Sequence, residues 1–467
     1  MRQLKRSLLA AIVFGSMAAV VSSGVSSANA STKPLGVTWM RSFAAPGTPA
    51  KYDKVGVIKV GPSSAKNVLV LEPGTSAGSA YFVPLAKWIV LKTTGWQVWS
   101  VERRENLLED QSELNLFKEG KATATELYDY YLGYLKNSSI TEHFQAISDS
   151  SVEFAKQWGM NVAVQDLHTV ITAAKRLGGK VVLGGHSLGG SVVTAYATWD
   201  FSGRAGADDL AGLVYIDGGS APGAVSAQDA TQVLQSLDAP TVTPWLSFGG
   251  IPAPFAGIFN ATGSASALLD PNGPSLGQAS GLLPSDIVPS VPVTNLGQYG
   301  YALNAATSPL SLLAAQGHLG EGITSSGGWN GAGALTPIER FAAMFSGYPM
   351  KGVDGTEWYF PQRLTDDTGA VDNGNANPAQ KVLDVDASMG SHLPKALRIY
   401  AFGARLGGAG VLQDARILAQ QSHIPMSNLT LVNRQSTYSH NDPAGAYPNN
   451  VFFDHLVPFL KKISSTG

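Results

Sequence analysis

The stretch Lys180-Val-Val-Leu-Gly-Gly-His-Ser-Leu-Gly-Gly190 decides how the rest of the chain is interpreted. It begins with three apolar residues, Val181–Leu183, which favour a buried β-strand. The chain then turns through glycines, and the next segment, 191–198, has the composition of a helix. The turn holds the pattern Gly-x-Ser-x-Gly at Gly185-His186-Ser187-Leu188-Gly189. Strand, glycine-flanked serine and helix together predict a sharp turn that presents the Ser187 hydroxyl at an exposed point.

Composition is that of a large folded protein. The chain has 467 residues, of which 44% are hydrophobic and 14% charged, so it can bury a core. This length suits one large domain, or one domain with a substantial insertion. Cysteine is absent, which excludes thiol catalysis and cysteine-ligated metals.

Residues 1–30 have the pattern of a secretory signal peptide. The basic residues Arg2, Lys5 and Arg6 precede a mostly apolar centre, and Ala28-Asn29-Ala30 matches a cleavage site. We therefore expect a secreted protein, extracellular or periplasmic. Loss of these three basic residues changes the formal net charge from −2 to −5, which gives no basic footprint for nucleic acid. No later stretch is apolar enough to predict stable membrane insertion.

The strand at 181–183 is one of several short apolar runs alternating with helical segments. This arrangement, with the serine turn, resembles the α/β-hydrolase fold of serine esterases and lipases. The resemblance implies an α/β fold with a mostly parallel sheet flanked by helices, its core in residues 31–220 and 396–467. It also implies a cap, or lid, insertion at 221–395 between strands six and seven. The other predicted strands are Val55–Val60, Asn67–Leu71, Trp96–Val101, Leu213–Ile216, Leu397–Phe402 and Leu429–Val432.

A serine hydroxyl needs an imidazole to take its proton and a third group to orient that imidazole. The family places the histidine after the last strand, where His440 is the one histidine before the closing helix. The usual acid position, after strand seven, holds Leu406. The candidates are then Asp217, directly after strand six, and Asp414, which we expect at the start of a helix over 415–421. We predict Ser187, Asp217 and His440 as the catalytic residues, with Asp414 as the alternative acid.

The oxyanion-hole donors are predicted by the same resemblance. In the family, the loop after strand three reads His-Gly-x, and here Pro73-Gly74-Thr75 matches it with proline in place of histidine. We therefore expect the backbone amides of Thr75 and Leu188 to hold an oxyanion. His186 and His318 fall outside the catalytic histidine position, and His186 is expected to be structural.

Other features receive structural interpretations. The charged run Glu102-Arg103-Arg104-Glu105 is interpreted as a solvated loop. The acidic pairs Asp366-Asp367 and Asp384-x-Asp386 lack the pattern of a calcium loop and are interpreted as solvated acids. Helices are expected over 122–135 and 142–158, and the tyrosines of the first are assigned to the core.

These residues predict a secreted serine hydrolase that cleaves small-molecule or polymeric carboxylic esters through an acyl-enzyme. No metal or organic cofactor is required for this chemistry. Two alternatives stay open: an acyltransferase, amidase or peptidase with the same elbow, and a non-catalytic binding protein with the same fold. Measuring how an acyl-enzyme partitions between water, alcohols and amines distinguishes the esterase from the first group of alternatives. Acyl and alcohol specificity and oligomeric state are not predicted.

Overall fold

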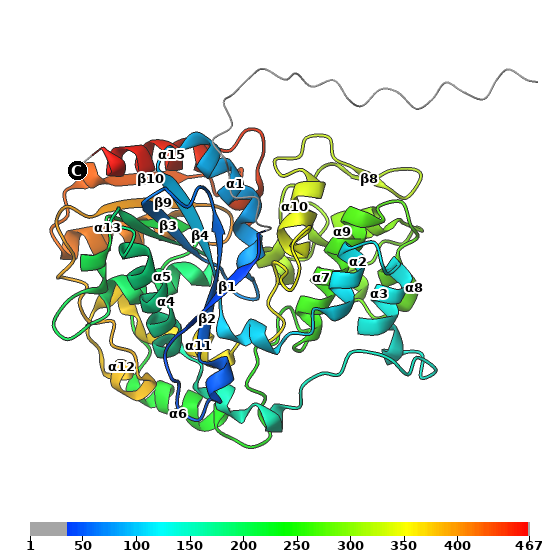
Figure 1. Ribbon diagram of the computed structural model, residues 1–467, viewed down its shortest axis with the longest axis horizontal. Helices are drawn as coiled ribbons and strands as arrows, with labels where there is room; N and C mark the ends of the chain where they lie inside the picture. Colours follow the sequence, from blue (N-terminus) through cyan, green and yellow to red (C-terminus); the bar gives the residue numbers. More distant parts are fainter. Residues whose placement is uncertain (1–34, 466–467) are drawn as a thin grey trace, which may run out of the picture. The chain divides into compact units, whose positions relative to one another are not determined.

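The computed structural model describes residues 35–465 (Figure 1). The predicted signal peptide at 1–30 and its cleavage site lie outside the described residues.

The described chain contains an eight-stranded sheet in the order β1-β2-β4-β3-β5-β6-β9-β10, which lies on the left in Figure 1. β2 pairs antiparallel with both of its neighbours, and the strands from β4 to β10 in this order are parallel. Every predicted strand is present, and this sheet contains one strand that sequence analysis missed, β1. The strands are β1 (Val37–Arg41), β2 (Lys54–Val60), β3 (Asn67–Glu72), β4 (Trp96–Glu102), β5 (Val181–His186), β6 (Gly212–Ile216), β9 (Arg398–Gly403) and β10 (Leu429–Asn433).

Helices cover both faces of this sheet. Side chains alternate between the faces of a strand, so Val181 and Leu183 of β5 point into one helical layer and Val182 into the other. A mostly parallel sheet between two helical layers is the arrangement that the resemblance implies, and the predicted α/β-hydrolase fold class is confirmed. One layer contains α4 (Met160–Lys175), α5 (Leu188–Thr198) and α13 (Gly408–Gln421), and the other α1 (Val83–Lys92) and α15 (Val451–Ser464).

Between β6 and β9 the chain forms a long series of helices outside the sheet. α7, α9 and α10 contact one another, and α2 and α3, from before β5, lie against α7 (Figure 1). α6 and α12 instead pack together, and their buried side chains join the core that contains α4 and α5. The elements are α2 (Ser112–Lys118), α3 (Ala124–Tyr131), α6 (Ala227–Leu237), α7 (Phe255–Leu269), α8 (Leu276–Ser280), α9 (Asn295–Leu303), β7 (Gly322–Ile323), β8 (Trp329–Asn330), α10 (Ile338–Ser346), α11 (Gln362–Asp367), α12 (Pro378–Leu383) and α14 (Asp442–Gly445).

Two predicted helices differ from the observed ones. The segment 142–158 forms only short 3-10 turns, because local hydrogen bonds such as Ser151 Oγ to the Ser148 carbonyl (2.7 Å) compete with a helix. The helix expected to start beside Asp414 begins at Gly408, so Asp414 lies inside α13 and does not cap it.

Candidate active site

The turn between β5 and α5 is as sharp as its sequence predicts. Ser187 has φ 57° and ψ −129°, a conformation that non-glycine residues rarely adopt. Neighbouring backbones force this geometry. A side chain at Gly185 would collide with the backbone of Gly189, and one at Gly189 would collide with the backbone of Glu72. The strained turn therefore depends on glycine on both sides of the serine.

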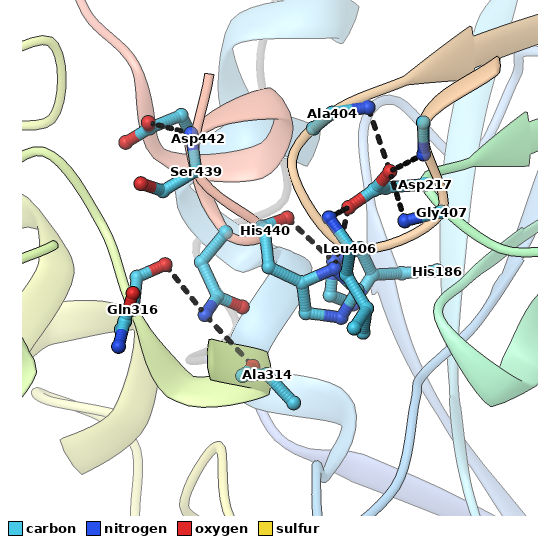
Figure 2. A network of polar contacts seen from close by, with 12 residues as sticks. His186, Asp217, Ala314, Gln316, Ala404, Leu406, Gly407, Ser439, His440 and Asp442 are labelled. Atoms are coloured by element: carbon cyan, nitrogen blue, oxygen red, sulfur yellow. Dashed lines mark hydrogen bonds and ion pairs between the residues drawn. The ribbon is translucent and has the colours of Figure 1, made fainter. Parts of the chain in front are cut away.

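Asp217 follows β6 directly and is 1% exposed. Its carboxylate accepts four backbone N–H groups from the turn after β9: Ala404 at 2.6 Å, Leu406 at 3.1 Å, Gly407 at 2.9 Å and Gly408 at 3.3 Å (Figure 2). The turn after β9 thus supplies amide donors to the carboxylate that follows the neighbouring strand β6.

His440 meets Asp217 from the loop after β10. Its Nδ1 lies 2.7 Å from Asp217 Oδ2, and its side chain is 1% exposed (Figure 2). Burial by itself would raise the pKa of the Asp217 carboxyl. The hydrogen bond and charge of His440 and the amide of Ala404 outweigh it and hold this pKa below its usual value. The carboxylate therefore stays ionised beside the imidazole.

Asp414, the alternative acid, has a different environment. It is half-buried on α13, and burial raises the pKa of its carboxyl to about 6. No hydrogen bond or ion pair joins its carboxylate to a histidine in the part of the chain that the structure describes. The structure thus brings His440 to Asp217 and not to Asp414.

The two predicted oxyanion donors flank Ser187. Leu188 is the first residue of α5, so its amide has no acceptor within the helix. Thr75 lines the same cavity as Ser187. The loop before it approaches the serine closely, since a Cβ added at Gly74 would lie 2.7 Å from Ser187 Cβ. Only glycine allows this approach.

His186, expected from the sequence to be structural, contacts the backbone of His440. Its Nε2 lies 2.9 Å from the carbonyl oxygen of His440, and its ring stacks on Tyr81. Burial, followed by the nearby His440, lowers the pKa of His186 to about 3, so the ring is neutral. The nitrogen facing a carbonyl must carry the proton, so Nε2–H donates to His440 and Nδ1 is left as a buried atom without a partner. His186 thereby anchors the backbone of His440.

A second histidine–aspartate pair, which sequence analysis missed, holds the same loop. His318 Nδ1 lies 2.5 Å from Asp442 Oδ2, and the Asp442 carboxylate also accepts the amide of Ser439 (2.6 Å) and the hydroxyl of Thr336 (2.8 Å). Next to it, the Asn441 amide donates to the carbonyls of Ala314 and Gln316, both at 3.1 Å. No local pattern predicts this contact, because 124 residues separate His318 from Asp442.

A cavity of about 160 Å³ opens in front of Ser187 and His440. Its remaining wall comes from α3, α7, α9 and the segments around them and is largely apolar. α7 contributes small residues, which leave space along the helix. Tyr128 belongs to the predicted tyrosine stripe, and its place in this wall corrects the assignment of that stripe to the core alone. Wall residues outside the sheet include Tyr128, Leu132, Phe248, Phe259, Gly263, Tyr299, Ala302 and Phe345.

Two interpretations of charged residues are wrong. Arg103 and Arg104 are 6% and 1% exposed, so the run Glu102–Glu105 is buried rather than solvated. Asp367 is also buried and pairs with Arg363 at 2.6 Å, so it is not a solvated acid.

Within residues 35–465 no group of three or more histidine, aspartate or glutamate side chains could hold a metal ion.

Among the helices of residues 35–465, none has the length and apolar character to cross a membrane.

Comparisons with known proteins give similarity in structure alone. No family model and no curated protein matches the chain. A candidate lipase from Sulfolobus solfataricus is 15% identical, with a TM-score of 0.46 over 91% of this chain and 93% of that one. A soluble variant of monoglyceride lipase from Saccharomyces cerevisiae is 11% identical, with a TM-score of 0.40 over 94% of this chain and 98% of that one. A carboxyl esterase from Bacillus coagulans is 12% identical, with a TM-score of 0.40 over 92% of this chain and 99% of that one.

Proposed function

We propose that the protein is a secreted serine hydrolase that cleaves carboxylic esters through Ser187, His440 and Asp217. The observation that supports this most is the buried 2.7 Å pair of Asp217 and His440, with His440 and the strained Ser187 lining one apolar cavity. A strained serine, a histidine and a buried acid in one site are the parts that nucleophilic catalysis requires. The helices α7, α9 and α10 act as the cap that holds the substrate.

In the first half of the reaction, Ser187 Oγ attacks the ester carbonyl carbon and its proton passes to His440. Asp217 holds the imidazole through Nδ1, which leaves Nε2 as the base, and stabilises the imidazolium that forms. The carbonyl oxygen becomes an oxyanion that accepts the amides of Thr75 and Leu188. His440 then gives its proton to the departing alcohol, and the acyl group stays on Ser187 as an ester.

In the second half, water attacks the acyl-enzyme while His440 takes one of its protons. The same two amides hold the second oxyanion. Collapse of this intermediate breaks the bond to Ser187 Oγ, which recovers a proton from His440, and the carboxylic acid leaves. The apolar cavity suits an acyl chain, since burial of each methylene contributes about 0.8 kcal/mol.

The test combines covalent labelling with turnover of p-nitrophenyl esters of graded chain length. A fluorophosphonate should label the wild type at Ser187, and Ser187→Ala should lose about three orders of magnitude or more in kcat. Ser191→Ala is the matched control, because Ser191 lies one turn further along α5 and donates to the Gly219 carbonyl at 2.7 Å. Labelling at another serine, or normal turnover by Ser187→Ala, would refute the proposal.

Secretion is proposed from the pattern of residues 1–30 alone. Protein recovered from the medium or periplasm should begin at Ser31. A mature protein that keeps the apolar stretch 8–21 would contradict this.

A further inference from the structure

We infer that Arg103 is the positioning residue that aims the Thr75 amide at the oxyanion, an inference that rests on the proposed function. Arg103 follows β4, and its side chain lies under the loop between β3 and α1. It does not line the cavity and touches no reacting atom. Its effect passes through the backbone of residues 73–77.

The guanidinium binds the carbonyl oxygens of this loop. Arg103 Nη2 donates to the carbonyl of Pro73 at 2.6 Å and to that of Gly74 at 2.8 Å. Nη1 adds longer contacts of 3.4 Å to the carbonyls of Gly74 and Ala77. One side chain thus binds three backbone carbonyls of this loop.

The contact to Gly74 fixes the direction of the next amide. The carbonyl of Gly74 and the N–H of Thr75 belong to one planar peptide unit, and in a trans unit they point in opposite directions. Arg103 draws the carbonyl toward the protein interior, so the N–H of Thr75 points away from it. The loop also runs close to Ser187, because a Cβ added at Gly74 would lie 2.7 Å from Ser187 Cβ. The amide is then free to face the cavity that Thr75 and Ser187 both line.

Two buried acids hold Arg103 in this position. Its Nε lies 2.9 Å from Glu72 Oε1 and its Nη1 2.7 Å from Glu357 Oε2, and all three side chains are at most 6% exposed. Glu72 ends β3, and the Glu357 amide donates to the Ser76 carbonyl at 3.1 Å. The guanidinium thus joins the sheet, the loop and the segment before α11. Lysine cannot reproduce this set of directed bonds, because its ammonium is a point donor and not a planar fork.

Arg104 provides a matched control. It is as deeply buried as Arg103 and is held by Asp166 at 2.7 Å and Asp53 at 3.1 Å. It also donates a hydrogen bond to the carbonyl of Phe43 and lies over the Trp158 ring, and no hydrogen bond joins it to the loop 73–77. Arg104→Lys therefore disturbs a similar buried ion pair without changing the Thr75 amide.

The experiment compares Arg103→Lys and Arg104→Lys in the full-length mature protein. The readouts are thermal stability, kcat and KM for a p-nitrophenyl ester, and the inhibition constant of an alkyl boronic acid. A boronic acid forms a tetrahedral anion on the serine and needs the oxyanion amides, whereas KM reports mainly ground-state binding. Arg103→Lys should lower kcat by roughly 10- to 100-fold and weaken the boronic acid by a similar factor, with little change in KM. Arg104→Lys should keep kcat and boronic acid binding.

If Arg103→Lys does not fold, Glu357→Gln replaces it in the same measurements. We expect kcat and boronic acid affinity to fall in this variant too, by less than in Arg103→Lys. A folded Arg103→Lys or Glu357→Gln with wild-type kcat and inhibition would overturn the inference, as would an equal loss in Arg104→Lys. Fluorophosphonate labelling of the wild type at Ser187 distinguishes failure of the Arg103 inference from failure of the proposed function. Without that label the proposed function falls, and this inference with it.

Discussion

Asp217 Oδ2 and His440 Nδ1 lie 2.7 Å apart, although 223 residues separate the two side chains in the sequence. β6 and β10 are parallel members of one sheet with β9 between them, so the loops at their carboxyl ends lie on the same edge. The pairing therefore follows from the topology of the sheet.

The choice of acid leads to the first prediction. Asp217→Asn should lower kcat by roughly four orders of magnitude in a folded protein, because the imidazole loses its orienting carboxylate. Asp414→Asn should stay within a few-fold of the wild type, since its carboxylate has no bond to His440. Steady-state kinetics on variants of matched thermal stability will decide. If Asp414→Asn is almost inactive and Asp217→Asn keeps its activity, the catalytic acid is Asp414 on α13 and the assignment is wrong.

The close approach of Gly74 to Ser187 gives the second prediction. In Gly74→Ala the new methyl group must displace Ser187 or the loop, since an ideal Cβ lies 2.7 Å from Ser187 Cβ. We expect kcat to fall roughly 100-fold. Gly410→Ala is the control, because nothing lies within 4 Å of a Cβ there and its place in α13 favours alanine. Equal kcat values for the two variants would refute the steric argument.

The third prediction concerns stability and pH. Glu102 is buried, and burial raises the pKa of its carboxyl to about 7 against the opposing hydrogen bonds from Ser79. A pKa that is higher in the folded state contributes stability that is fully present below the unfolded pKa and is lost as pH rises through 7.

Glu102→Gln cannot ionise, so this loss should disappear in the variant. The unfolding free energy of the wild type relative to Glu102→Gln should therefore decrease between pH 4.5 and 8. Urea denaturation of both proteins at pH 5 and pH 8 measures the difference, in which other titrating groups cancel. An identical difference at the two pH values would show that Glu102 does not titrate in this range.

The fourth prediction tests the cavity as the acyl site. Gly263 of α7 lines the cavity, and an ideal Cβ there makes an ordinary 3.5 Å contact with Tyr299, so a Cβ fits without backbone movement. Gly263→Leu should fill part of the cavity and reduce kcat/KM for an octanoate ester roughly tenfold or more. The acetate ester is the internal control and should change little. A parallel loss on both esters would mean that the acyl chain lies elsewhere.

Much of the fold follows from local patterns in the sequence. The apolar runs that end in glycine or polar residues predict every strand of the eight-stranded sheet except β1, whose residues Val37–Arg41 pair only at the edge of the sheet. The serine turn is equally local, because the glycines around Ser187 are needed for backbone contacts within a few residues. The roles of Ser187, Asp217, His440, Thr75 and Leu188 stay predictions.

The sequence by itself determined the α/β class, the positions of most strands along the chain and the strained serine turn, because these depend on periodicity and on backbone sterics between near neighbours. Only the tertiary structure decided which acid meets His440 and that Arg103 and Arg104 are buried. It also decided that His318 pairs with Asp442. Each of these depends on donors and acceptors that lie far apart along the chain. A charged residue is compatible with the interior once such partners surround it, and local composition does not encode where those partners come from.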